Sequence, residues 1–187
     1  MSTIAQLSLT QYERMVEAGV FEGALPQHLE FLRGVIVQMN PIGAGHSDAV
    51  SELSDWSYEF TDRQQIRIRV QMPLRIPILN SEPEPDLLWA VRKNYSLQHP
   101  EPQDVLLLIE VADSSLETDH NEKLQLYAEA GIVEYWVINL TDQCIEVYRE
   151  PTGRTYQWSR TAARDEVIHP LNFPEAKLQP SRIFVPN

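Results

Sequence analysis

The 187-residue chain is 43% hydrophobic and 22% charged, which is typical of a globular protein and excludes a disordered one. No stretch reaches the apolar length of a membrane span, and the N-terminus lacks a basic-then-apolar signal pattern. We therefore expect a cytoplasmic protein with a single domain, residues 1–187. The net charge of −12 disfavours non-specific binding to phosphate backbones, so any nucleic-acid partner would need a local basic face.

The cysteine and histidine residues do not predict a metal site. Cys144 is the single cysteine, which excludes an internal disulfide and a multi-cysteine metal site. Its neighbours in CIEVY alternate as in a strand, so we expect a packing residue and not a nucleophile. The five histidines are scattered without metal-ligand spacing, at His28, His46, His99, His120 and His169.

The first third of the chain predicts a helix, a hairpin and a second helix. Thr10–Glu13 has a capping-box pattern, and apolar residues continue it at helical spacing, namely Tyr12, Met15 and Val16. Residues 28–39 predict two strands around a tight Arg33-Gly34 turn. After a loop at 41–45, residues 46–60 predict a helix whose apolar side holds Val50, Leu53, Trp56 and Phe60.

The next segments predict two strands joined by a polar loop. Residues 65–78 alternate with a period of two, so one face carries Ile66, Ile68 and Val70. The other face carries Gln65, Arg67, Arg69 and Gln71. Residues 81–91 form a loop that leads into a strand at Asp86, and residues 92–104 predict a polar loop.

The remaining elements complete a mixed architecture. Residues 105–112 predict a buried strand, and residues 119–130 predict a helix with Asp119 as N-cap and Gly131 as C′ residue. Residues 133–140 and 144–150 predict a hairpin, and residues 154–159 another strand. Helices lie between more numerous strands, which indicates an α/β (mixed α+β) domain with a mixed central sheet.

Two acidic residues interrupt apolar strands. Asp86 follows Pro85 and opens a strand in which Leu88 and Ala90 share its face. Glu110 shares a face with Leu106, Leu108 and Ala112. If these strands are neighbours, the two carboxylates converge. Asp86 is equally explained as a turn or strand-edge residue, and Glu110 as part of a buried ion pair with Arg67 or Arg69.

Two converging carboxylates predict a divalent cation. Burying each carboxylate costs roughly several kcal/mol of desolvation free energy, and the two negative charges repel each other. A cation removes both costs, and hard oxygen ligands without histidine or cysteine favour Mg²⁺ or Mn²⁺ over Zn²⁺.

Lys123 lies in the first turn of the predicted helix, where the macrodipole disfavours a cation by about 0.3–1 kcal/mol. The short turn after the Glu110 strand would bring this helix back to the same end of the sheet. Lys123 could then orient an attacking water or stabilise charge on a phosphate. The alternative is a solvated residue beside Glu122 and Asp119.

Two further residues are candidates for the same site. His46 begins a predicted helix and is either an N-terminal polar residue or one that lines the site. Glu30 lies in a strand before a tight turn and points opposite to Phe31. It is either a residue of an exposed face or an additional acid.

The segment PDLLWA and the block from Asp104 to Leu140 closely resemble the Uma-type family of putative restriction endonucleases, within the PD-(D/E)XK nuclease superfamily. The resemblance extends over most of the chain, through LTQYERMVEAGVF, LEFLRGVIVQMNPIGAGHS, IRVQMPLRI and CIEVYRE. It implies a restriction-endonuclease-like core, a mixed sheet flanked by helices with additional antiparallel strands and a Mg²⁺-type site at one edge.

The resemblance also assigns roles to individual residues. It makes Asp86 the aspartate of the PD motif and Glu110 the glutamate of the second half-motif. The lysine usually found two residues later is replaced by Ala112, and the resemblance relocates it to Lys123. Glu30 matches an N-terminal acidic position that could complete the metal shell, and Gln71 matches a polar position before the PD strand.

The function implied is metal-dependent hydrolysis of phosphodiester bonds in nucleic acid by water activated at the cation, with DNA as the expected substrate. A local basic face could come from Arg63, Arg67, Arg69, Arg75, Arg92 and Lys93. The alternatives are an inactive nuclease-fold module that binds a protein or nucleic acid, and a hydrolase of RNA or a small phosphodiester. We expect a homodimer, because many nucleases that cut duplexes are dimers and VEYWVINL could serve an interface.

Overall fold

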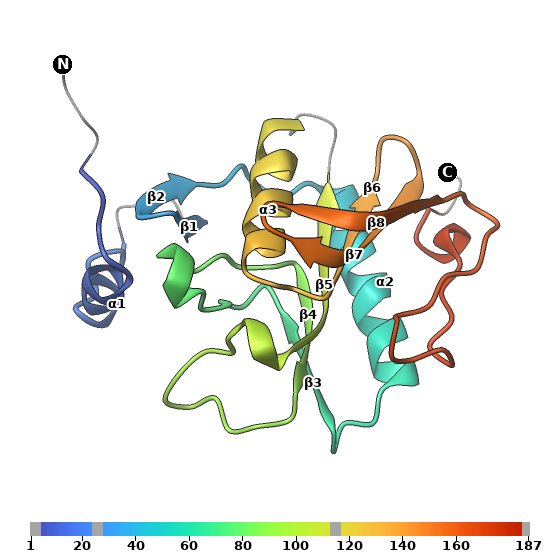
Figure 1. Ribbon diagram of the computed structural model, residues 1–187, viewed down its shortest axis with the longest axis horizontal. Coiled ribbons are helices and arrows are strands. Elements are labelled where there is room, and N and C mark those ends of the chain that lie inside the picture. The colour runs from blue at the N-terminus through green and yellow to red at the C-terminus, as the bar shows by residue number, and fades with distance from the viewer. Residues whose placement is uncertain (1–4, 24–27, 113–116, 185–187) are drawn as a thin grey trace.

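A six-stranded sheet forms the centre of the computed structural model, which describes residues 5–23, 28–112 and 117–184 (Figure 1). Its strands lie in the order β3 (Ile66–Val70), β4 (Leu87–Val91), β5 (Val105–Ala112), β6 (Glu134–Asn139), β7 (Cys144–Thr152) and β8 (Thr155–Ala162). β5 and β6 are parallel, and the other neighbours are antiparallel. The sheet is therefore mixed, which confirms the predicted fold class.

Two helices cover opposite faces of this sheet (Figure 1). α2 (Ala44–Phe60) packs on one face, where the ring of Trp56 stacks at 5.1 Å on Trp89 and 5.8 Å on Trp136. α3 (Glu117–Glu129) makes the crossover between the parallel strands and packs Tyr127 against Tyr135 on the other face. Alternate residues of β4 and β5 face the two helices, so both strands are buried on both sides.

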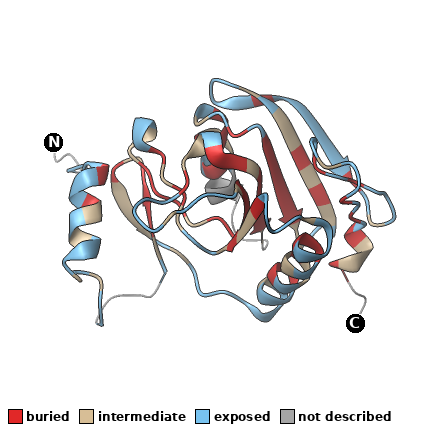
Figure 2. Cartoon of the chain, turned by 90° about the horizontal axis from the view of Figure 1, so that it is seen from below, coloured by how far each residue is buried: buried red, intermediate tan, exposed pale blue. Residues whose placement is uncertain are grey.

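A small N-terminal unit lies at one end of the molecule, with α1 (Leu9–Glu17) largely exposed (Figure 2). It contains a two-stranded antiparallel sheet of β1 (Leu29–Leu32) and β2 (Val35–Gln38). The turn between these strands uses positive φ angles at Arg33 and Gly34, as the sequence predicted. A β-bridge between Phe31 and Glu82 joins the unit to the segment before β4.

Short 3₁₀ helices occur at Pro77–Leu79, Pro102–Asp104 and Pro180–Arg182. In the described ranges, no helix combines the length and the apolar character that crossing a bilayer requires.

The N-terminal capping box differs from the predicted one. Ser8 is the N-cap residue: its Oγ accepts from the backbone N–H of Gln11, and its own N–H donates to Gln11 Oε1 at 2.8 Å. Thr10 therefore lies inside the helix, because the same motif is satisfied two residues earlier. At the end of α2, Phe60 is 38% exposed and does not extend the buried stripe.

A bulge in β5 corrects the predicted face of Leu106. The pairing of β4 with β5 shifts between Trp89 and Ala90, where Ala90 pairs with Val105. Val105 then packs on the α3 side, whereas Leu106 packs with the α2-side cluster. Leu106 therefore does not share the face of Glu110. The alternation from Leu107 to Val111 is regular and keeps the predicted face for the acid.

The aromatic residues of β6 serve the core. Tyr135 and Trp136 are fully buried between β5 and β7, in the hairpin that the sequence predicted with β7. Tyr135 and Trp136 are therefore not available for contacts with a second copy of the chain. The homodimer stays a prediction.

Glu82 is a buried acid in the segment that joins the two sheets. Its backbone pairs with Phe31, with the N–H of Glu82 donating to Phe31 O at 2.6 Å. The residue is 7% exposed, and its Oε2 has no hydrogen-bond partner among the described residues. Burial, reinforced by the negative charge of Glu13, raises the pKa of Glu82 to about 7.

The variant Glu82→Gln should make folding stability less dependent on pH. Between pH 4.5 and about 7 the folded chain binds more protons at Glu82 than the unfolded chain, so wild-type stability falls as the pH rises. At about pH 8 the variant should be more stable by about 1–3 kcal/mol. Urea unfolding at several pH values measures this. The exposed acid Glu175 gives the control variant Glu175→Gln, and equal stability of wild type and Glu82→Gln at about pH 8 would contradict the assignment.

Candidate active site

Asp86 and Glu110 lie opposite each other on neighbouring strands. β4 pairs with β5 through Leu87↔Ile109 and Leu88↔Leu108, and the same register places Asp86, just before β4, opposite Glu110. Side chains directly opposite in an antiparallel pair have Cβ atoms about 4.5–5.5 Å apart. The predicted convergence of the two carboxylates is therefore built into the pairing of the two strands.

The carboxylate of Asp86 is held on both oxygens. Oδ2 accepts from the backbone N–H of Val111 at 2.8 Å and lies 3.1 Å from His46 Nε2, and Oδ1 accepts from Gln71 at 3.3 Å. Burial acts to raise the pKa of Asp86, but the hydrogen bond and charge of His46, the Val111 N–H and the charge of Lys123 together lower it. Asp86 is therefore an ionised carboxylate in a fixed orientation.

Gln71 reaches Asp86 because the chain turns at the end of β3. Its φ angle is +48°, and its backbone N–H donates to Asp86 O at 3.1 Å. Left-handed backbone is uncommon for a residue with a side chain. The turn ends the pairing of β3 with β4 at this residue, and the Gln71 side chain then faces Asp86.

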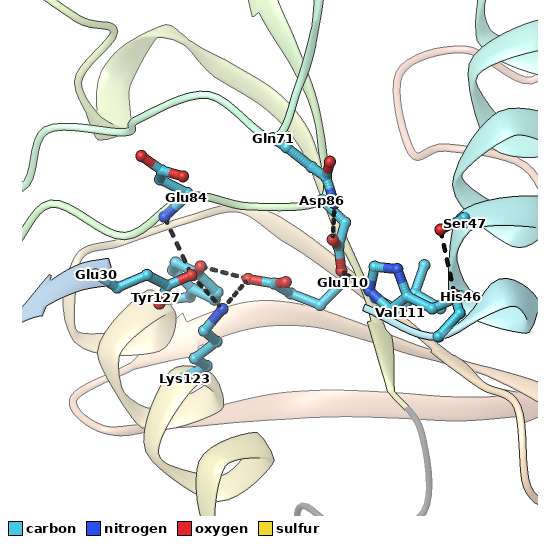
Figure 3. A network of polar contacts seen from close by, with 11 residues as sticks. Glu30, His46, Ser47, Gln71, Glu84, Asp86, Glu110, Val111, Lys123 and Tyr127 are labelled. Atoms are coloured by element: carbon cyan, nitrogen blue, oxygen red, sulfur yellow. Dashed lines mark hydrogen bonds and ion pairs between the residues drawn. The ribbon is translucent and has the colours of Figure 1, made fainter. Parts of the chain in front are cut away.

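Lys123 lies between Glu30 and Glu110 (Figure 3). Its Nζ donates to Glu30 Oε1 at 2.9 Å and to Glu110 Oε1 at 3.1 Å. Tyr127, one turn further along α3, donates its hydroxyl to the same Glu110 oxygen at 2.7 Å. The backbone N–H of Glu84 also donates to Glu30 Oε1, at 3.4 Å. One ammonium group thus connects β1, β5 and α3.

This arrangement contradicts the alternative interpretations of Glu30 and Lys123 and corrects the expected ion-pair partner of Glu110. Glu30 is 4% exposed, so it does not belong to an exposed strand face. Lys123 is 9% exposed and is not a solvated helix residue. Glu110 does have the ion-pair partner that a buried acid requires, but this partner is Lys123 and not Arg67 or Arg69.

The position of Lys123 in its helix also differs from the prediction. α3 begins at Glu117, so Asp119 lies in the first turn and is not the N-cap, and Lys123 is the seventh residue. The macrodipole acts mainly within the first turn, so it does not explain why a lysine is unusual here. The predicted C′ residue is confirmed: Gly131 has a φ of +78°, and its N–H donates to Ala128 O.

The buried charges set the protonation of the cluster. Burial is the largest cause that raises the pKa of Glu110; the charges of Asp86 and Glu30 add to this effect, and Lys123 and the Tyr127 hydroxyl offset part of it. Burial acts to lower the pKa of Lys123, but the same three carboxylates outweigh it and raise the pKa above its usual value. Lys123 is therefore a permanent cation at neutral pH.

These residues line a cavity of about 210 Å³. It is bounded by β1, the loop before α2, the ends of β3 to β5, the start of β6, and α3. The lining residues are His28, Leu29, Glu30, Met39, Asn40, Pro41, Ile42, Gly43, His46, Gln71, Glu84, Asp86, Glu110, Val111, Ala112, Lys123 and Tyr135. Every predicted site residue, including His46 and Gln71, is among them.

The structure adds two polar residues that the sequence analysis did not single out. Tyr127 follows Lys123 by four residues, so both lie on one side of α3, and this helical spacing was a usable signal. Glu84 precedes Asp86 by two residues in an extended segment, and its pKa is raised by burial and by Glu30. The sequence did not single out Glu84, because an acid in a proline-containing segment is typical of an exposed loop.

The predicted basic face is mostly engaged within the chain. Arg75 is paired with two glutamates, and Lys93 is paired with Asp104. Arg69 lies on the α3 face of the sheet, but its guanidinium is buried 5.7 Å from the ring centre of Tyr95, away from the cavity. Arg92 donates to the backbone of Arg63, and Arg63 lies over the ring of Tyr58. Lys123 is the one Lys or Arg among the described residues that line the cavity.

The donor set fits a hard divalent cation in part. Within the described ranges, no three Asp, Glu, His or Cys side chains are grouped closely enough to enclose a metal ion. Mg²⁺ commonly binds one or two carboxylates and completes its shell with water and substrate phosphate. Asp86 and Glu110 match that requirement. Glu30 is committed to Lys123 and the Glu84 N–H through Oε1, and its buried Oε2 has no described partner.

Removing the Tyr127 hydroxyl should lower the stability of the folded chain. In Tyr127→Phe, Glu110 loses a buried hydrogen bond, so the free energy of unfolding should fall by about 1 kcal/mol. The matched control is Tyr156→Phe, because the Tyr156 hydroxyl is buried and has no hydrogen-bond partner in the described structure. That variant should be as stable as wild type or more stable. Urea unfolding of both variants tests this, and equal effects would contradict a specific role for Tyr127.

Comparison with known proteins shows the family and the fold. A putative nuclease belonging to DUF820 from Anabaena variabilis superposes with a TM-score of 0.71 at 16% identity, over 95% of this chain and 97% of that one. The type IIG restriction endonuclease BpuSI matches 64% of this chain and 14% of its own, at 13% identity and a TM-score of 0.41. No curated protein matches. The family model Uma2, described as putative restriction endonuclease, matches residues 10–181. The chain therefore belongs to the Uma2 family of putative restriction endonucleases.

Proposed function

We propose that this chain is a metal-dependent endonuclease that hydrolyses phosphodiester bonds in nucleic acid, with DNA as the substrate. The observation that carries the proposal is the pairing of Asp86 opposite Glu110, with the ammonium of Lys123 on Glu110. The family supports a nuclease, and the geometry supplies two carboxylates and one permanent cation in a single cavity. The choice of DNA rests on the family description, which names restriction endonucleases.

Asp86 and Glu110 are the proposed ligands of Mg²⁺ or Mn²⁺. When bound, such a cation supplies Lewis acidity toward a phosphate oxygen and lowers the pKa of water. Asp86 is suited to this role because its ionised carboxylate is already oriented by His46 and by the Val111 N–H. Glu110 is oriented in the same way by Lys123 and Tyr127, both of which bind Oε1.

Lys123 supplies the positive charge that the reaction needs beside the phosphate. Its ammonium is buried and held by two glutamates, so it keeps its proton and its position. A donor fixed in this way stabilises negative charge as it develops in the transition state, without a further cost of reorganisation. Glu30 positions Lys123 from the opposite side, and its service as a metal ligand stays a prediction.

An inactive nuclease-fold module is the second candidate. The engagement of Arg69, Arg75 and Lys93 within the chain favours it, because a nuclease for long duplexes needs cations along the phosphate backbone. The presence of all three proposed catalytic side chains in one cavity favours the enzyme.

Variants of the two acids and of the lysine should have different effects on metal binding and on cleavage. Asp86→Ala and Glu110→Ala should lose saturable Mn²⁺ binding in calorimetry and lose cleavage, since each removes a ligand. Lys123→Ala should still bind Mn²⁺, more weakly than wild type because Glu110 loses an orienting contact, and should lose cleavage by about 10²–10³-fold because the charge beside the phosphate is removed. Cleavage is measured with Mg²⁺ on duplex DNA, single-stranded DNA and RNA.

The matched control for these variants is Asp165→Ala, an exposed acid outside the cavity, which should behave as wild type. A wild type that binds no Mn²⁺ at millimolar concentration and cleaves none of the three substrates would reject the enzyme. The inactive module would then be the better description.

Binding to DNA should depend weakly on salt. The cavity offers one Lys or Arg among the described residues, so few counterions are released, and the slope of log K against log salt should be about −1 to −2. Fluorescence anisotropy of the wild type with labelled duplex in EDTA, which withholds the divalent cation and keeps Lys123 in place, measures the slope at several KCl concentrations. A slope near −6 would reveal an extended basic surface and would contradict this expectation.

A further inference from the structure

A second pocket, of about 380 Å³, lies between α1 and the loop after β4. It shares no lining residue with the cavity around Asp86 and Glu110. Three acids line it, Glu13 and Glu17 from α1 and Glu82 from the segment before β4. Arg75 is the one Lys or Arg among its described lining residues. The pocket is therefore acidic, and it lies outside the proposed nuclease site.

Glu82 gives this pocket a polar group in need of a partner. The side chain lines the pocket, it is 93% buried, and Oε2 accepts no hydrogen bond from the described residues. A buried carboxylate without a donor costs free energy that a bound N–H group would recover. Arg75 does not supply that donor, because its Nε and Nη1 bind Glu13 at 2.6 Å and Glu101 at 2.9 Å.

The walls of the pocket include hydrocarbon. Val16 on α1 is 49% exposed, and Leu97 in the loop is 98% exposed. Both line the same pocket as Glu82. A ligand that carries methylene groups would cover these two side chains and gain by removing them from water.

The donor set distinguishes an organic cation from a metal ion. Within the described residues, no three acids, histidines or cysteines lie close enough together to hold a metal, so a metal ion here would have fewer than three such protein ligands. An ammonium group has three N–H donors and accepts looser geometry, and the chain attached to it would meet the apolar wall. The face of the Tyr95 ring is already covered by Arg69, which argues against a stacked guanidinium.

We propose that this pocket binds an alkylammonium group, the chemistry shared by polyamines and lysine side chains, with the ammonium at Glu82 and its methylenes against Val16 and Leu97. The site is independent of phosphodiester hydrolysis, so it stands whether or not the cavity at Asp86 cleaves nucleic acid. Acidic charge alone would not create this binding site. The site also requires the buried carboxylate of Glu82 and the apolar side chains of Val16 and Leu97.

The test is calorimetric titration of the full chain with putrescine at low salt and at about pH 8, above the pKa of Glu82. Wild type should bind it saturably, and Glu82→Gln should bind it about tenfold more weakly or worse, through loss of the charged acceptor. Glu175→Gln, which makes the same charge change at an exposed acid, should bind as wild type does. Mg²⁺ matches the charge of putrescine without its methylenes and should not compete at equal concentration.

Two further arms separate the source of the ammonium and the role of the wall. Leu97→Ser should weaken putrescine binding by about threefold or more, since it removes apolar contact. Lysine amide blocked at its α-amine should bind if the natural ligand is a lysine side chain, and only putrescine should bind if it is a polyamine. Absence of putrescine binding at about 10 mM, equal binding by Glu82→Gln, equal loss in Glu175→Gln, or competition by Mg²⁺ would each overturn the proposal.

Discussion

The buried ammonium of Lys123 is the interaction on which the arrangement of the site depends. Three carboxylates, Glu30, Asp86 and Glu110, raise its pKa, and two of them contact it directly. Without this charge the acids would repel one another in a medium that screens poorly. The lysine also links three elements that are not hydrogen-bonded neighbours in a sheet. The acidic cluster is thus stable as a structure before any cation or substrate is considered.

The sequence predicted the strands and the opposed acids well, because these depend on local patterns. Asp86 and Glu110 each break an apolar run, and period-two alternation then fixes their face. The face of Leu106 could not be predicted, since a bulge depends on how two strands pair and leaves no mark in either strand alone. The burial of Glu30 was equally hidden: it follows from a contact with Lys123, 93 residues later in the chain.

The basic residues also show that local sequence does not predict which side chains are exposed. Six basic residues were candidates for a nucleic-acid face, and the chain uses Arg75 and Lys93 in ion pairs with its own acids. With a net charge of −12 there are more acids than bases, so a basic side chain readily finds an internal partner. Composition therefore predicted the scarcity of available cations better than the positions of individual arginines did.

The separation of Glu30 from Lys123 has a consequence for the order of folding. Residues 30, 86, 110 and 123 come together only when the hairpin, the strands of the central sheet and α3 have all docked. Contacts that close long loops form late, because the loss of chain entropy precedes the gain from the contact. A growing chain on the ribosome would carry no complete site until well after residue 123 had emerged. The cluster of Glu30, Asp86, Glu110 and Lys123 would therefore exist only in the finished fold.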